Sequence, residues 1–348
     1  MTMAAGLALV LLMSTGPDVL GQQTAMKSKG LTDVPGIKVG HFTLAERPTG
    51  CTVILAEAGA VAGVNVRGAA PATRETDVLN PVNLVQIAHA IVLSGGSAFG
   101  LDAASGVMRY LEEKKVGFAF GRAHVPIVPA AALFDLSVGD GMIRPTAECG
   151  YKAAQIASAN AVPEGNVGAG AGATVGKAGG MGRAMKGGIG TASITMPDGL
   201  IVSALVATNG MGDIIDPDSG RVIAGALAAD GKSFADARKL LRSGAIKFRS
   251  GENTTLGVIA TNAVLTKTQA TRVAEMAHDG FARAIVPSHT PVDGDTIFTL
   301  ATGSKPGAAD DGLIGVLAAD VMAQAIVRSV RQATSIPGFP AARDISSP

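Results

Sequence analysis

The sequence of 348 residues contains no tryptophan, only two tyrosines and ten phenylalanines. It also has no stripe of Lys and Arg, because 29 basic and 28 acidic residues are spread along the chain and leave a net charge of +1. Proteins bind single-stranded nucleic acids through stacked aromatic side chains and cationic grooves. Since both features are scarce here, we expect no nucleic-acid partner.

Metal-binding and redox motifs are absent from the sequence as well. The two cysteines, Cys51 and Cys149, form no CxxC pair and match no metal-ligand spacing. The five histidines form no HxxxH or HExxH pattern. We therefore expect neither a catalytic metal nor a cofactor, and we interpret the cysteines as small buried side chains rather than a catalytic thiol or a disulfide.

An apolar run in residues 4–13 has the length of the core of a secretory signal peptide. Val19 and Gly21 fit the −3 and −1 positions of a cleavage site before Gln22. Although no Lys or Arg precedes the run, the pattern favours removal of residues 1–21 and a periplasmic or secreted protein. A cytoplasmic protein with an N-terminal extension or a misplaced start codon is the alternative. No other run is long enough to span a membrane, so we expect no membrane insertion.

Strand and helix patterns alternate from about residue 31 onward. Hairpins are predicted over residues 51–66 and, around a Pro-Asp-Gly turn, over residues 193–209. Helices are predicted over residues 83–89, 101–114, 266–284 and 313–332, strands over 256–260 and 297–301, and a surface connector over 234–249. Thr266 and Gln269 fit a capping box. This alternation favours a layered α/β or α+β domain.

Residues 168–177, GAGAGATVGK, are similar to a phosphate-binding loop but do not match it. Ala171 stands where the first glycine of that loop belongs, and Ala178 where the Mg²⁺-binding Ser or Thr belongs. The dinucleotide pattern GxGxxG fails in the same segment. We expect these glycines to form tight turns, or to let the backbone line a pocket with N–H groups.

A polar connector becomes an apolar strand at Asn253 and Thr254. Such residues commonly begin strands and turns, and Asn253-Thr254-Thr255 also fits the N-glycosylation acceptor pattern. Residues 251–263, however, resemble the self-cleavage site of the DmpA-like N-terminal-nucleophile aminopeptidases, which include L-aminopeptidase/D-esterases and β-peptidyl aminopeptidases. In that family a Ser or Thr directly precedes an apolar strand that runs into Ala-Thr-Asp-Ala, and here Thr254 precedes TLGVI and then Ala-Thr-Asn-Ala.

Further segments resemble the same family, in the same order. Residues 68–77 are similar to its Gly-x-x-Pro-x-Thr-Arg-Glu-Thr-Asp segment, and residues 94–100, 167–172 and 186–193 also match. The resemblance implies a four-layer αββα sandwich over residues 31–345, self-cleaved into an α-chain of residues 22–253 and a β-chain of residues 254–348. It also implies a homo-oligomer of these αβ heterodimers.

The resemblance assigns a role to each candidate site residue. The Thr254 hydroxyl would attack the Asn253 carbonyl and, after cleavage, act as the nucleophile with its own freed amine as base, since α-amino groups have a pKa of about 7.7–8.0. Asn209 would donate to the oxyanion, unless it merely forms a turn before Gly210.

Asp293 and Asp295 replace the family's Ser-Gly-Glu and would orient and tune the nucleophile, unless they form a solvated turn. Two acids would, however, favour the charged amine, which opposes its role as a base. Phe134 and Gly170 would contact the substrate, with Phe134 in place of a tyrosine.

The expected function is hydrolysis of N-terminal residues from small peptides, amides or esters. Two alternatives are an acyltransferase similar to the ornithine acetyltransferases and an uncleaved small-molecule-binding protein.

Overall fold

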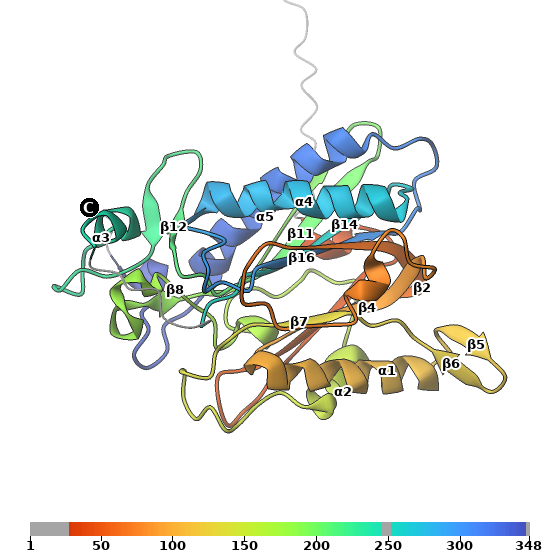
Figure 1. The fold of residues 1–348 in the computed structure, drawn as a ribbon, viewed down its shortest axis with the longest axis horizontal. Helices are drawn as coiled ribbons and strands as arrows, with labels where there is room; N and C mark the ends of the chain where they lie inside the picture. The colour runs from red at the N-terminus through yellow and green to blue at the C-terminus, as the bar shows by residue number, and fades with distance from the viewer. Residues whose placement is uncertain (1–27, 245–251, 346–348) are drawn as a thin grey trace, which may run out of the picture.

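The computed structural model describes residues 28–244 and 252–345. The predicted signal peptide and residues 245–249 of the predicted connector lie outside the described residues. The strands form stacked layers, and helices cover the outer faces of these layers (Figure 1).

Eight of the strands in the described residues form one continuous hydrogen-bonded path. Its order is β10 (Gly188–Thr195), β11 (Ile201–Thr208), β14 (Leu256–Thr261), β16 (Thr296–Ala301), β2 (Gly50–Val66), β4 (Ile87–Ser94), β7 (Ala130–Ala132) and β3 (Thr73–Arg74). β1 (Lys38–Thr43) pairs with β2 beside this path. Neighbouring strands are antiparallel except β14 with β16 and β4 with β7, which are parallel.

β2 is 17 residues long and belongs to both layers of strands. Its first half pairs with β1 and β4, its second half pairs with β16, and its register with β4 shifts between Leu55 and Ala60. At this shift Gly59 has a φ of +83°, which glycine adopts without steric cost. The predicted hairpin over residues 51–66 is therefore wrong, because strands paired along both edges keep this segment extended and its small residues only bend it.

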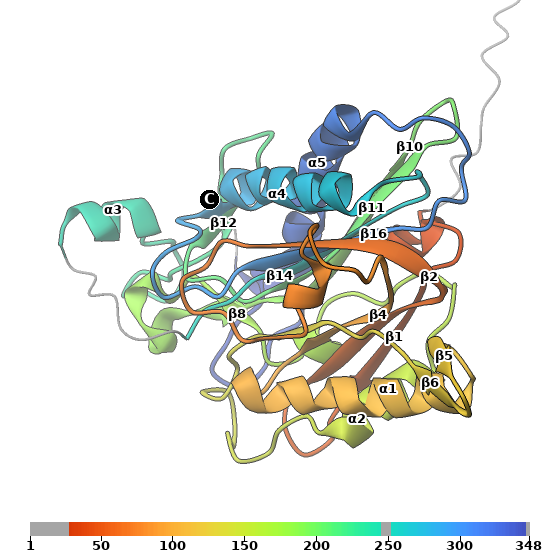
Figure 2. The same ribbon diagram turned by 45° about the vertical axis from the view of Figure 1, so that its right-hand side comes forward.

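Two pairs of helices cover the outer faces of the strand layers. α4 (Lys267–Ala284) and α5 (Asp311–Gln332) lie on one side, and α1 (Ala103–Glu113) and α2 (Ala147–Gln155) lie on the other (Figures 1 and 2). α4 begins with the predicted capping box, in which the Thr266 side chain accepts from the Gln269 N–H and Gln269 accepts from the Thr266 N–H.

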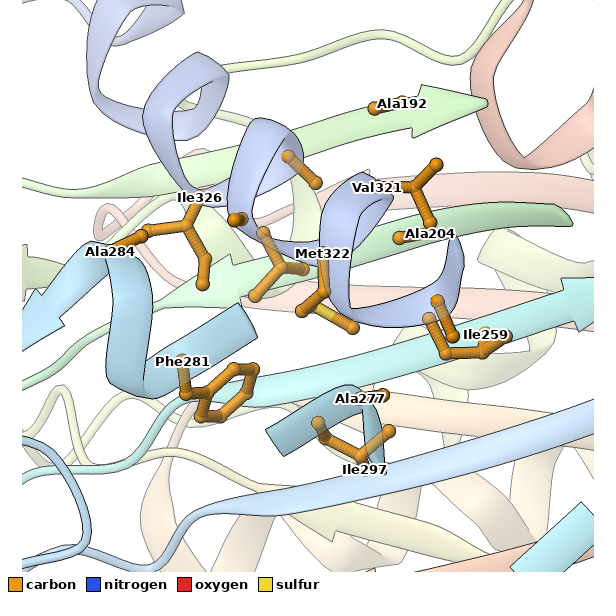
Figure 3. Packing of buried hydrophobic residues seen from close by; sticks show 14 of the residues in the cluster. Ala192, Ala204, Ile259, Ala277, Phe281, Ala284, Ile297, Val321, Met322 and Ile326 are labelled. Atoms are coloured by element: carbon orange, nitrogen blue, oxygen red, sulfur yellow. The ribbon is translucent and has the colours of Figure 1, made fainter. Parts of the chain in front are cut away.

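Side-chain alternation along the strands separates the larger hydrophobic cores. In β14, Leu256 and Val258 belong to the core between the two strand layers, whereas Ile259 belongs to the core beneath α4 and α5. In that outer core Phe281 and Met322 pack against the strands (Figure 3). A third core lies beneath α1 and α2. The four-layer αββα sandwich is thus confirmed, with the difference that β2 joins its two strand layers into one sheet.

The described residues also contain seven shorter strands and one short α-helix. They are β5 (Phe118–Phe120), β6 (Ala123–Val125), β8 (Thr174–Val175), β9 (Met185–Lys186), β12 (Asp213–Ile215), β13 (Val222–Ala224), β15 (Ile285–Val286) and α3 (Ala237–Arg242). The helices predicted over residues 101–114, 266–284 and 313–332, the hairpin over 193–209 and both predicted strands are confirmed. The helix predicted over residues 83–89 is wrong, because β4 begins at Ile87 and pairs with strands on both sides.

α5 is long and apolar enough to cross a membrane by length and composition alone. Its most apolar window of 18 residues is, however, 67% buried inside the protein. Side chains of this helix, among them Met322 and Ile326, pack onto the strands (Figure 3). Its apolar character is therefore explained by its place in the core.

Cys51 in β2 and Cys149 in α2 form a disulfide. Both side chains are buried, as expected, but the expectation that they are unpaired is wrong. The two residues are 98 positions apart, so no local sequence pattern predicts the disulfide. The disulfide ties the helical layer to the strand beneath it.

Replacing both Cys51 and Cys149 by alanine should lower the free energy of unfolding by about 2–4 kcal/mol, because the bond restricts a long loop of the unfolded chain. Urea denaturation of the wild type and the double variant checks this value, with the wild type in reductant as a second comparison. If the denatured wild type takes up thiol label without a reductant, the disulfide is contradicted.

Candidate active site

Three neighbouring strand ends bring the candidate residues together. Asn209 directly follows β11, Thr254 precedes β14, and Asp295 precedes β16. In the antiparallel pair β11–β14, Ala207 lies opposite Leu256. In the parallel pair β14–β16, Leu256 lies beside Thr296. The three ends therefore meet at one edge of the sheet.

Thr254 is buried, and its polar atoms contact the preceding peptide and the end of β11. Its hydroxyl donates to the Asn253 carbonyl at 2.5 Å, and its N–H donates to the Asn209 carbonyl at 3.1 Å. The same Asn253 carbonyl accepts the Gly294 N–H at 2.9 Å. A backbone N–H directed at a carbonyl oxygen stabilises the negative charge that develops there during attack. Sequence reasoning did not identify this donor, since backbone groups have no sequence signature.

Asp295 binds the residue that follows Thr254. One carboxylate oxygen accepts the Thr255 N–H at 2.7 Å. The other accepts from His289, through its backbone N–H at 3.2 Å and its ring Nδ1 at 2.8 Å. Asp295 thus connects the start of β14 to the loop before β16.

Asp293 lies two residues earlier in that loop and is also buried. One of its oxygens accepts from the N–H and hydroxyl of Thr290, at 2.8 and 2.5 Å. The other oxygen has no hydrogen-bond partner within residues 28–244 and 252–345. Burial, and secondarily the charge of Asp295, raise the pKa of Asp293. The alternative of a solvated Asp-Gly-Asp turn is wrong, because both carboxylates are enclosed by protein.

The start of the segment 68–77 packs on this loop. The N–H groups of Arg67 and Gly68 donate to the Asp295 carbonyl, at 3.0 and 3.3 Å, and that of Ala70 donates to the Asp293 carbonyl at 2.9 Å. Two segments that resemble the same family, far apart in the sequence, therefore form one hydrogen-bonded unit beside Thr254.

Lys177 is a functional candidate that the sequence motifs did not reveal. Its ammonium donates to the carbonyl and the side-chain oxygen of Asn209, at 2.9 and 3.0 Å, and to the Glu252 carbonyl at 3.2 Å. Burial lowers the pKa of Lys177 to about 7, against the opposing effect of nearby acids, the largest being that of Asp293. Lys177 ends the glycine-rich segment that failed as a phosphate-binding loop, and no local pattern connects it with Thr254.

Asn209 is completely buried and uses both ends of its side-chain amide. The oxygen accepts from the Thr174 N–H at 2.9 Å as well as from Lys177, which identifies the other end as nitrogen. That nitrogen donates to the Phe134 carbonyl at 2.9 Å. One N–H of the amide remains for a further acceptor. The predicted donation to an oxyanion remains a prediction.

The two predicted substrate contacts lie in different surroundings. Phe134 is half-buried and touches the site through its carbonyl. Gly170 is buried, and its carbonyl accepts from the ammonium of the enclosed Lys186 at 2.8 Å. Their contacts with substrate stay predictions. In the part of the chain that the structure describes, no group of three or more His, Cys, Asp or Glu side chains is arranged to hold a metal ion.

The chain is similar to known proteins over most of its length. Residues 29–343 match the model of peptidase family S58. The chain is 42% identical over 342 residues to an uncharacterized aminopeptidase of Mycobacterium tuberculosis, covering 90% of this chain and 97% of that protein. It is 30% identical over 313 residues to a 6-aminohexanoate-oligomer endohydrolase of a Kocuria species, covering 86% of this chain and 85% of that protein.

A solved structure shares the fold. The L-aminopeptidase D-Ala-esterase/amidase of Ochrobactrum anthropi, described as a prototype for the serine aminopeptidases and a variant of the Ntn hydrolase fold, superposes with a TM-score of 0.65. The match covers 90% of each chain at 20% sequence identity. The architecture is thus shared even where few residues are identical.

Gly294→Ala should destabilise the protein by about 1–3 kcal/mol, because overpacking a filled site forces its neighbours apart. The added methyl group would lie 2.5 Å from the Ala70 carbonyl oxygen and 2.8 Å from the Thr254 hydroxyl. Gly182→Ala is the matched control, since its methyl group would meet nothing within 4 Å. Urea midpoints that are equal for the two variants would contradict the tight packing described here.

Proposed function

The chain belongs to peptidase family S58 and is a peptide-bond hydrolase, and we propose that it activates itself by cutting its own chain between Asn253 and Thr254. The observation that carries this proposal is the contact of the Thr254 hydroxyl with the Asn253 carbonyl at 2.5 Å, beside the Gly294 N–H on the same oxygen. The hydroxyl is adjacent to the peptide bond that would be cut, and a donor for the oxyanion is already in place.

The cleavage proceeds in two steps. The Thr254 hydroxyl oxygen bonds to the carbonyl carbon of Asn253, the C–N bond breaks, and the hydroxyl proton passes to the Thr254 nitrogen. This leaves an ester between the two residues. Water then hydrolyses the ester, which releases a carboxylate on Asn253 and restores the hydroxyl of Thr254 next to a free α-amine.

The freed amine of Thr254 is the proposed base for its own hydroxyl during catalysis. In the uncut chain this nitrogen donates to the Asn209 carbonyl, which also accepts from Lys177. The two amines would therefore share one acceptor after cleavage. Two closely spaced amines titrate as a pair. The first proton leaves at a pH well below the ordinary pKa of an amine, because two neighbouring positive charges repel each other.

Lys177 thus offsets the effect of the two aspartates. Asp293 and Asp295 by themselves would hold a proton on the amine, whereas a neighbouring ammonium favours the neutral amine that a base must be. Asp295 also accepts the hydrogen bond of the Thr255 N–H. The Asp293 oxygen that has no partner among the described residues can accept from the freed amine. We propose that this mixture of charges allows the amine to act as a base near neutral pH.

The proposed substrates are small peptides, amides or esters with a free N-terminal residue. The aminopeptidase name of the mycobacterial relative supports this class. The endohydrolase name of the Kocuria relative supports oligomers of 6-aminohexanoate as a second class of amide. An acyltransferase finds no comparable support.

We also propose export to an oxidising compartment. The disulfide between Cys51 and Cys149 supports it, because such bonds persist outside the reducing cytosol. Assembly into a homo-oligomer of αβ heterodimers remains a prediction from the family resemblance.

Thr254→Ala should leave a single uncut chain, whereas the wild type should give two fragments that meet at Asn253 and Thr254. Intact mass spectrometry of the purified proteins checks this. Thr254→Ser should still be cut, since it keeps the hydroxyl. Thr255→Val is the matched control: the hydroxyl of Thr255 is buried and has no partner among the described residues, so its loss should leave cleavage unchanged. An uncut wild type would contradict the mechanism.

Lys177→Met should move the acid limb of kcat/KM upward by about 1–2 pH units, because loss of the neighbouring ammonium raises the pKa of the Thr254 amine. Activity at pH 7 should then fall about tenfold or more. The measurement is hydrolysis of an amino acid p-nitroanilide across pH 5–10, at matched amounts of cleaved enzyme. The exposed Lys239→Met serves as control. A limb that stays in place or moves downward would exclude this role for Lys177.

A further inference from the structure

We infer that His289 is a positioning residue of this site, which holds the Asp295 carboxylate against the Thr255 N–H and thereby orients the Thr254 nucleophile. This inference rests on the proposed function of Thr254. His289 belongs to neither the sequence motif before β16 nor the residues that contact Thr254, and it acts through Asp295 alone.

The contacts of Asp295 divide between the two sides of the site. One oxygen is committed to the Thr255 N–H at 2.7 Å. Within the described residues, the opposite oxygen has two donors, and both belong to His289. The imidazole is therefore the side-chain donor that keeps this carboxylate from rotating away from β14. A charged acceptor with a neutral N–H donor makes a short, strong hydrogen bond.

The position of the imidazole proton follows from these partners. A carboxylate oxygen only accepts, so Nδ1 of His289 carries the proton that it donates at 2.8 Å. Nε2 is buried and has no partner within the described chain. The contact with Asp295 therefore uses Nδ1 as the donor, and Nε2 makes no hydrogen bond within the described chain.

The ring is also held by its neighbours on α4. It stacks on Phe281 with ring centroids 5.8 Å apart, and it meets the edge of His278 at 4.8 Å. The Nε2 atom of His278 lies 3.1 Å from the Asn65 carbonyl, to which it donates, and burial lowers the pKa of His278 to about 4. His278 is therefore neutral at pH 7, and its Nε2 proton is donated to the Asn65 carbonyl.

The backbone of His289 adopts a conformation that few side chains accept. Its φ is +53°, in the left-handed region where Asn, Asp and His are enriched among residues other than glycine. This conformation lets the backbone N–H and the ring of one residue reach the same carboxylate oxygen. His289 thus contributes through its backbone conformation, its ring packing and its hydrogen bonds. A test of its role must measure these three contributions separately.

Three substitutions separate these contributions. His289→Asn places an amide N–H near the position of Nδ1 and tolerates the left-handed backbone. His289→Gly tolerates the same backbone but lacks the donor, and His289→Phe keeps an aromatic ring but lacks the donor. The readouts are the rate of chain cleavage and, for the cleaved fraction, kcat and KM with L-alanine p-nitroanilide. A thermal melt of each variant shows whether it is folded.

If His289 positions Asp295, His289→Asn should keep kcat within about threefold of the wild type. The Gly and Phe variants should lose about 10- to 100-fold in kcat, as expected for a misplaced nucleophile, with KM changed less than about threefold. Equal activity of the Gly and Asn variants would overturn the inference in favour of backbone conformation. An active Phe variant would overturn it in favour of ring packing.

The experiment also distinguishes the inference from its premise. If the wild type is cleaved and active, and the Gly and Phe variants are fully active, the inference about His289 is overturned while the proposed function of Thr254 stands. A wild type that stays uncut and inactive under the same conditions overturns the proposed function, and the role of His289 with it. The inference is also overturned if kcat falls in all three variants in proportion to the decrease in their melting temperature. That result would indicate that His289 has a purely structural role.

Discussion

The site depends on the register of three neighbouring strands. Because β11 and β14 are antiparallel while β14 and β16 are parallel, the end of the first strand and the beginnings of the other two lie at one level of the sheet. A shift of one residue in either pair would turn the side chains to the opposite face. The hydrogen bonds from Thr254 to Asn209 and from Thr255 to Asp295 thus come from the same register that orders the core.

The cores on both sides hold this register in place. Leu256 and Val258 pack between the two strand layers, and Ile259 packs beneath α4 and α5, so β14 is buried on both faces. β2 continues from one layer into the other, and the disulfide at Cys51 ties it to α2. A rigid frame of this kind holds reacting groups at fixed distances, which is what intramolecular attack on a peptide bond requires.

The charges at the site form one balanced group. Burying two carboxylates without hydrogen-bond donors would cost free energy of folding. One oxygen of Asp293 accepts from the N–H and the hydroxyl of Thr290, and one oxygen of Asp295 accepts from the ring of His289. Lys177 brings a cation to the same small volume, and Asn209 holds it there through two oxygen atoms. Asn209 therefore links Lys177 with the nitrogen of Thr254.

The sequence by itself determined the long helices, the hairpin around the Pro-Asp-Gly turn and, through the family resemblance, the candidates Thr254, Asn209, Asp293 and Asp295. These signals are local: they need only periodicity, turn residues or a short motif. The tertiary structure alone decided that residues 51–66 form one strand, that Cys51 pairs with a cysteine 98 positions away, and that Lys177 reaches Asn209. The reason is physical, since sheet pairing, disulfides, burial and shifted pKa values depend on distance in space, and a sequence pattern records only distance along the chain.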